Sequence, residues 1–210
     1  MKKLLGFLVL ALMLCGNANS KNYLTPWGLK ITVSDNFLYL GKDDNLEKNC
    51  KLIEEMGISK QSTCEKFYKN LSDGRIIYIV SKNSKKTTIN ANRQSLGTTI
   101  YPTSQIEANQ ICNHLRKNYE TMTRLSLEIK NCVLEYVPKK INTNKFKSSL
   151  NNKIKSILHY SQGVSKYNRT QSQYFIHYDN YMLTFTTGCQ VGECKEGNDE
   201  IINIINSINF

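Results

Sequence analysis

Histidines and cysteines are the side chains of this sequence that could do chemistry, and the histidines are His114, His159 and His177. The first falls on the polar side of a helix pattern, where a solvated histidine is the ordinary outcome. If strands 154–160 and 174–178 pair in a register centred on residue 168, His159 and His177 lie directly opposite each other. Such a pair could hold part of a metal site or respond to pH, or it could be a polar pair on the exposed sheet face.

The motifs of common enzyme classes are missing from the sequence. There is no GxSxG, HExxH, GxxxxGK[ST] or GxGxxG, so no cofactor site is indicated. The paired carboxylates at 43–44, 54–55 and 199–200 are neighbours in sequence near helix ends or on helix surfaces, where capping or solvation accounts for them. We therefore expect no catalytic residues, no cofactor and no metal.

The first twenty residues have the layout of a bacterial signal peptide. Two lysines precede an apolar run of 11 residues, Leu4 to Leu14, and residues 18–20 have small side chains where a signal peptidase reads them. The run is too short for a membrane span, and no later segment is long enough. We expect a soluble, single-domain mature chain, 21–210, in the periplasm or secreted. A lipoprotein anchored through Cys15 is the alternative, which the bulky residue before it disfavours.

The mature chain would keep six cysteines, and an even number in an exported protein indicates disulfide bonds. Zinc is the competing interpretation, but no CxxC or paired Cys/His spacing is present. Sequence alone allows many connectivities. The faces of the expected elements favour pairs of nearest neighbours: Cys50 with Cys64, Cys112 with Cys132, and Cys189 with Cys194.

Positive charge is concentrated in two segments. The chain has 28 basic and 17 acidic residues, and loss of Lys2 and Lys3 would leave a net charge of +9. Residues 74–106 contain five bases and residues 136–178 contain eight, with no acid in either segment. A solvated lysine face is one explanation, and a face for an anionic partner is the other. The anion-binding candidates are Lys139, Lys140, Lys145, Lys147, Lys153, Lys155, Lys166 and Arg169. Lys153 and Lys155 share strand parity with the two histidines, which predicts one cationic face.

The stretch from Ser104 to Val137 organises the expected fold. Its first half has the apolar spacing of a helix that runs to Met122, with Ser104 as the cap. Its second half alternates as a strand, and the phase slips at residues 130–131, which predicts a bulge or a tight turn there. A disulfide from Cys112 to Cys132 would fasten this helix to the sheet.

Other patterns complete the element order. We expect strands within 27–40 and 75–82, a cysteine-bearing helical pair between them, a mobile loop or irregular hairpin over 83–102, a strand at 154–160, a hairpin of 174–178 with 181–185, and a last helix capped by Asn198 or Asp199. Strands outnumber helices, so the fold class is α+β, a mainly antiparallel β-sheet covered by helices and stapled by disulfides.

The two ends of the chain resemble PsbP-like α/β sandwich proteins. At the start, Trp27-Gly28 precedes an alternating strand. At the end, the hairpin into Leu183-Thr184-Phe185 precedes a helix that closes in Ser207-Ile208-Asn209-Phe210. The resemblance implies an α/β sandwich and a non-enzymatic accessory or assembly role, and it transfers no site residues.

These observations favour a secreted binding or accessory protein of the bacterial cell envelope, with a basic face for an anionic component or an acidic protein. A small envelope hydrolase is the alternative. It would need convergent titratable groups in a concave site.

Overall fold

The computed structural model describes residues 20–42, 46–55, 69–83, 87–96, 101–123, 128–147, 150–164, 169–190 and 194–210. The predicted signal peptide before residue 20 and the predicted helix around Cys64 lie largely outside these residues. Within the described part of the chain, none of the helices has the length and hydropathy of a membrane-spanning helix.

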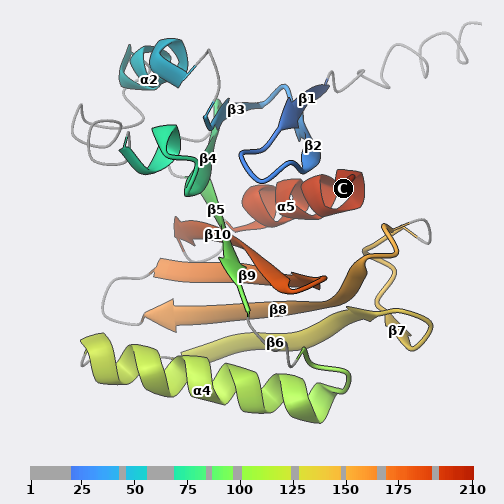
Figure 1. Cartoon of the computed structure of the whole chain (residues 1–210). Helices are drawn as coiled ribbons and strands as arrows, with labels where there is room; N and C mark the ends of the chain where they lie inside the picture. The colour runs from blue at the N-terminus through green and yellow to red at the C-terminus, as the bar shows by residue number, and fades with distance from the viewer. Residues whose placement is uncertain are drawn as a thin grey trace, which may run out of the picture.

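A large antiparallel sheet forms the centre of the molecule (Figure 1). Among the described residues it has eight strands, in the spatial order β3-β4-β5-β10-β9-β8-β6-β7. Their bounds are β3 Phe37–Leu40, β4 Ile76–Ser81, β5 Thr88–Ser95, β6 Glu128–Val137, β7 Ile141–Asn142, β8 Ile154–Val164, β9 Arg169–Tyr178 and β10 Tyr181–Gln190. Two further strands, β1 (Ser20–Leu24) and β2 (Lys30–Ser34), form a separate antiparallel hairpin. The predicted mainly antiparallel α+β fold is confirmed.

Several of these elements can be compared directly with the predictions from local sequence patterns. The β9–β10 hairpin pairs Tyr178 with Tyr181 across the predicted turn, and Asp179 takes a positive φ of 44° there. The prediction of a mobile loop or irregular hairpin over 83–102 is wrong, because this polar segment contains the regular strand β5, which pairs with β4 and β10 inside the sheet. Helix α2 (Leu46–Glu55) lies where the first helix of the cysteine-bearing pair is predicted.

Helix α5 (Lys195–Ser207) lies between the large sheet and the β1–β2 hairpin (Figure 1). Its Ile201, Ile204 and Ile205 are buried in the main core together with Ile31 and Val33 of the hairpin. The helix begins before the predicted cap at Asn198 or Asp199. The amide of Asn198 already donates to the carbonyl of Cys194, so that prediction is wrong by about one turn.

Strand β2 has one edge without a strand neighbour, and α5 satisfies its amides. Ser34 donates its backbone N–H and its hydroxyl to the two carboxylate oxygens of Glu200, at 2.8 and 2.9 Å. The amide of Thr32 donates to the Ser207 hydroxyl, and the amide of Lys30 donates to the carbonyl of Asn209. Alternate residues of the strand are therefore bonded to one helix and the residues that follow it.

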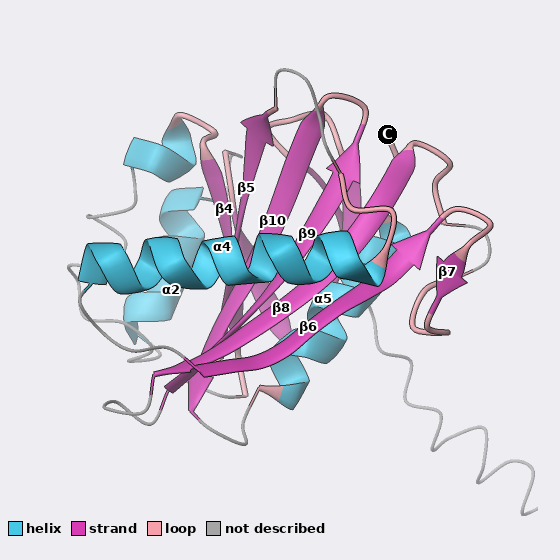
Figure 2. Ribbon diagram, turned by 90° about the horizontal axis from the view of Figure 1, so that it is seen from below, coloured by secondary structure: helices cyan, strands magenta, loops and turns pink. Residues whose placement is uncertain are grey.

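Helix α4 (Gln105–Thr123) runs across the opposite face of the sheet (Figure 2). Ala108 and Cys112 share a buried cluster with Leu134, Leu158 and other residues of β6, β8 and β9. The Ser104 hydroxyl accepts the Glu107 amide, as a cap does. The apolar stripe does not extend as far as predicted, because Met122 is 84% exposed.

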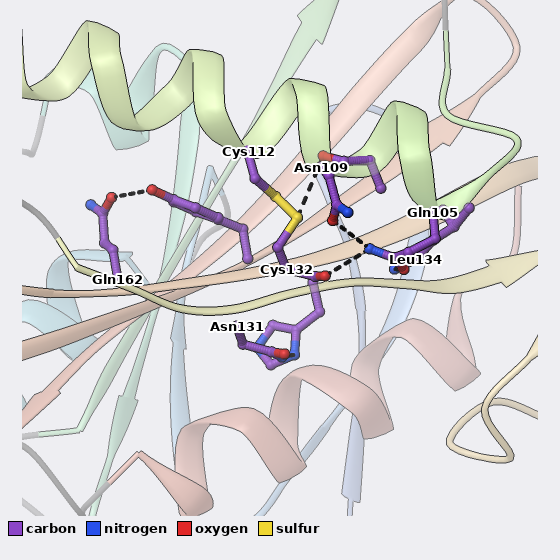
Figure 3. The surroundings of a disulfide bond; sticks show 10 residues. Gln105, Asn109, Cys112, Asn131, Cys132, Leu134 and Gln162 are labelled. Carbon is purple, nitrogen blue, oxygen red and sulfur yellow. Dashed lines mark hydrogen bonds between the residues drawn. A yellow bond between two sulfur atoms is a disulfide. The ribbon is translucent and has the colours of Figure 1, made fainter.

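Strand β6 departs from regular pairing with β8 at two places. The shift between Ile129 and Asn131 confirms the predicted bulge, and a second shift between Leu134 and Tyr136 leaves Glu135 without an opposed residue. The outer edge of β6 is bonded to α4 through Gln105. Its side-chain nitrogen donates to the carbonyl of Cys132, and its oxygen accepts the amide of Leu134 (Figure 3).

Cys112 and Cys132 form the predicted disulfide between α4 and β6, with their Cα atoms 6.3 Å apart (Figure 3). Cys50 and Cys194 are also disulfide-bonded. The side chains of their predicted partners, Cys64 and Cys189, lie outside the described part of the structure, so those two pairings stay predictions.

Replacing Cys112 and Cys132 together by alanine should destabilise the protein. The bond closes a loop with a sequence separation of 20 residues, for which chain entropy gives about 3 kcal/mol of unfolding free energy. Urea unfolding of the double variant and of the wild type measures this difference. Ile106→Ala changes an exposed residue of the same helix and is the control. A double variant as stable as the wild type would contradict the prediction.

Candidate functional site

The two histidines of β8 and β9 are not partners, and the predicted pair is wrong. The strands pair His159 with Tyr174 and His177 with Ser156, which is a different register from the predicted one. His159 belongs to the α5 side of the sheet, where its ring stacks on Tyr174 at 4.3 Å between centroids. An irregularity between Ile154 and Ser156 shifts the phase of β8. The single face predicted for both histidines with Lys153 and Lys155 therefore does not form.

His159 instead lies at the centre of a buried polar chain. Its Nε2 is 2.7 Å from the Ser172 hydroxyl. Its Nδ1 is 2.6 Å from the Asn131 side-chain nitrogen and 3.4 Å from a carboxylate oxygen of Glu135. The order serine, histidine, carboxylate is that of a hydrolase triad.

Glu135 is the anchor of this chain. Its side chain accepts hydrogen bonds from the Thr143 hydroxyl at 2.5 Å and from the Lys145 ammonium, both on the segment after β6. Burial alone would raise its pKa. The hydrogen bonds from His159, Lys145 and Thr143, together with the Lys145 charge, outweigh burial and lower the pKa of Glu135 to about 2. The carboxylate is therefore ionised and shared between a histidine and a lysine.

The burial of this chain argues against catalysis. Ser172 is 1% exposed, His159 7% and Glu135 0%. Catalysis at a seryl oxygen requires that a substrate reach it and that donors face the developing oxyanion. A pocket among the described residues lies elsewhere, around β1, β2 and β3. In this conformation the Glu135–His159–Ser172 chain is a satisfied buried network.

His177 lies in a separate buried environment. Its Nδ1 is 3.0 Å from the Ser156 hydroxyl. Burial lowers its pKa to about 4, so the ring is neutral near pH 7. Because the folded pKa is depressed below 6.5, protonation favours the unfolded chain, so this histidine lowers the stability of the fold as the pH falls from 6.5 towards 4. Within the described residues no three His, Cys, Asp or Glu side chains are grouped as metal ligands.

The predicted basic residues divide between the two ends of the sheet. Lys139 and Lys140 lie in the turn after β6, Lys145 and Lys147 follow β7, and Lys153 and Lys155 flank the start of β8. Arg169 begins β9 and is paired with Val164, the last residue of β8, so it lies at the far end of that long strand. Lys166 is outside the described residues. A continuous basic segment therefore does not give one continuous basic surface.

Two contributors to the polar chain, Glu135 and Ser172, were not among the sequence candidates. The sequence feature that could have identified Glu135 as a candidate is its position between Leu134 and Tyr136 in an otherwise apolar strand. Strict alternation assigns such a residue to the solvent face. The register shift at Glu135 instead leaves it among Thr143, Lys145 and His159.

Glu135 should make the protein sensitive to acid. Its folded pKa is below the ordinary 4.5, so the unfolded chain takes up a proton first as the pH falls. Its contribution is present above pH 4.5 and is lost towards pH 2, about 3 kcal/mol in all. Glu135→Gln should be less stable at pH 7, because Lys145 loses its counter-charge, and should show a flatter decline below pH 4.5.

Urea unfolding at a series of pH values tests this expectation. Glu128→Gln, an exposed acid of the same strand paired with Lys130, is the matched control. Parallel pH profiles for the wild type and Glu135→Gln would show that Glu135 is not the group responsible.

Comparisons with known proteins concern the fold. No protein-family model and no curated sequence matches the chain. Among solved structures the chain is similar to cyanobacterial PsbP from Synechocystis, with a TM-score of 0.52 and 8% sequence identity, over 93% of this chain and 94% of that one. The predicted resemblance to PsbP-like α/β sandwich proteins is therefore confirmed, and it extends from the two ends to nearly the whole chain.

Proposed function

We propose that this protein is an exported, non-enzymatic binding or accessory protein of the bacterial cell envelope. In this proposal it contacts an anionic partner through one end of its sheet. The fold likeness to PsbP and the disulfide between α4 and β6 support an accessory protein of an oxidising compartment. The pattern of the first twenty residues supports export.

The observation that carries the proposal is a group of lysines at the end of the sheet where β6 finishes and β8 begins. We call this group the lysine end: Lys139, Lys140, Lys147, Lys153 and Lys155. The strand pairs Val137 with Ile141, Tyr136 with Ile157 and Ile154 with Tyr178 bring the segments that carry these lysines to the same end. All but Lys155 are exposed, and Lys155 is half-exposed.

Carboxylates neutralise this group only weakly. The salt bridges of the described residues include none of the five, whereas the neighbouring Lys145 is bonded to Glu135. Lys139 has a φ of 59°, a conformation that costs a non-glycine residue about 1 kcal/mol. Long-range attraction of an anionic surface adds up over such exposed charges and weakens with salt.

Envelope polyanions, anionic lipid headgroups or acidic polysaccharides, are the partners that we favour. An exported protein meets them before it meets nucleic acid. A solvated lysine surface remains the competing explanation, and it predicts no binding. The two explanations differ in the response to charge reversal at defined positions.

Charge reversal at the lysine end should abolish binding to an anionic membrane. Each base near such a surface contributes about 1 kcal/mol, so Lys139→Glu/Lys140→Glu/Lys153→Glu should lose at least about a hundredfold in affinity. Sedimentation with vesicles that contain phosphatidylglycerol measures this, and a column of acidic polysaccharide gives the second arm. Binding by the wild type should fall steeply between about 50 mM and about 500 mM salt.

The matched control is Lys69→Glu/Lys117→Glu/Lys195→Glu, which changes the net charge equally at exposed positions on other elements. Similar losses in both triple variants would show attraction by net charge alone. Absence of wild-type binding in both arms would leave these lysines as a solvated surface and would overturn the proposal.

The hydrolase alternative rests on the Ser172–His159–Glu135 order of contacts. A fluorophosphonate probe, which reacts with activated serines, should leave the folded protein unlabelled because Ser172 is 1% exposed. Ser172→Ala serves as the control for any label that appears. Labelling of the wild type that this substitution removes would favour the hydrolase instead.

A further inference from the structure

A pocket of about 420 Å³ lies beside the β1–β2 hairpin, away from the lysine end. Its walls come from β1, β2, β3, the turn between β2 and β3, α2, and the residue after β4. The lining residues are Lys21, Asn22, Tyr23, Val33, Ser34, Asp35, Phe37, Leu38, Lys48 and Lys82. Its volume is that of pockets that take small molecules.

The charged groups of this pocket are mainly cationic. Three lysines line it against one carboxylate, Asp35. Lys82 donates to the backbone carbonyl of Asp35 at 2.5 Å and so forms part of the wall. The acid nearby on α2, Glu47, is 3.3 Å from Lys51 and does not line the pocket. The ammonium groups of Lys21 and Lys48 are therefore the donors that an anion could use.

Two other polar groups of the lining are already committed. The Asn22 side-chain oxygen accepts the Thr32 hydroxyl at 2.9 Å. Ser34 gives its amide and hydroxyl to Glu200, as described above. A ligand that used these two groups would have to break these bonds, whereas an anion bound to lysines would not.

The rest of the lining is apolar or aromatic. Leu38 and Tyr23 are partly exposed and present the apolar surface of the pocket, whereas Val33 and Phe37, at 1% and 5% exposure, are covered by the main core. Tyr23 stacks on Tyr39 at 4.3 Å between ring centroids, which fixes the position of its ring. An apolar floor with cationic groups beside it matches a molecule that carries a negative group on a hydrophobic body.

We propose that this pocket binds a small phosphomonoester of an apolar or aromatic alcohol. The phosphate would lie against Lys21 and Lys48, since a lysine binds phosphate as a compact point charge. The organic part would pack on Leu38 and the Tyr23 ring. This site is independent of the lysine end, so either proposal can fail without the other.

The test uses phenyl phosphate as the probe and the full-length mature chain. In a ¹H–¹⁵N NMR titration, amide signals of Tyr23, Phe37, Leu38 and Lys48 should shift together and saturate. Lys21→Glu and Lys48→Glu should each weaken binding about tenfold or more, the effect of losing one charged hydrogen bond. The matched control is Lys51→Glu, which lies on the same helix as Lys48, is exposed and does not line the pocket.

Any of the following outcomes would overturn the proposal. Equal affinity for inorganic phosphate and phenyl phosphate would mean that the apolar lining contributes nothing to binding of the phenyl group. Equal losses in Lys48→Glu and Lys51→Glu would mean attraction by charge alone. Shifts scattered over the surface, or none in the pocket, would remove the site, and the dispersion of the NMR spectrum shows whether each variant is folded.

Discussion

Unpaired backbone groups along strand edges must find partners, and side chains on or beside helices supply them in this protein. An edge strand that lacks such partners leaves donors and acceptors exposed to pairing with another chain. On one side of the molecule Gln105 of α4 bonds the outer edge of β6. On the other, Glu200 and Ser207 of α5 take the amides of β2. These contacts fix each helix to a strand edge as well as to the apolar core.

The polar chain inside the sheet is built around one buried carboxylate. Glu135 lies at a register shift of β6 and is 0% exposed, and an isolated buried charge is costly. Thr143, Lys145 and His159 together offset that cost. The Ser172 hydroxyl then bonds the other ring nitrogen of the histidine. The resulting order of groups matches a catalytic triad, but geometry without access to substrate is insufficient for catalysis.

Both proposals place function at the surface of this fold. The two cationic regions, the lysine end and the pocket near β1, differ in shape and in the residues that surround the lysines. The lysine end is an exposed group on turns and strand starts, suited to an extended anionic surface. The pocket near β1 combines lysines with an apolar floor, suited to a small molecule. PsbP-like proteins share the architecture, but at 8% identity the site residues must be argued from this chain alone.

Local patterns in the sequence determined much of the fold: the β9–β10 hairpin, the apolar stripe of α4 as far as Leu115, the bulge near Lys130 and the Cys112–Cys132 disulfide. Each depends on residues that alternate or recur over a few positions, so neighbouring residues suffice to predict it. The pairing of β8 with β9 did not follow, because an irregularity at Ile154–Ser156 changes which residues face each other. The inward position of Glu135 and the separation of Arg169 from the other bases were likewise decided only by tertiary structure. Both depend on strand register over long distances, which a single sequence does not encode in any short window.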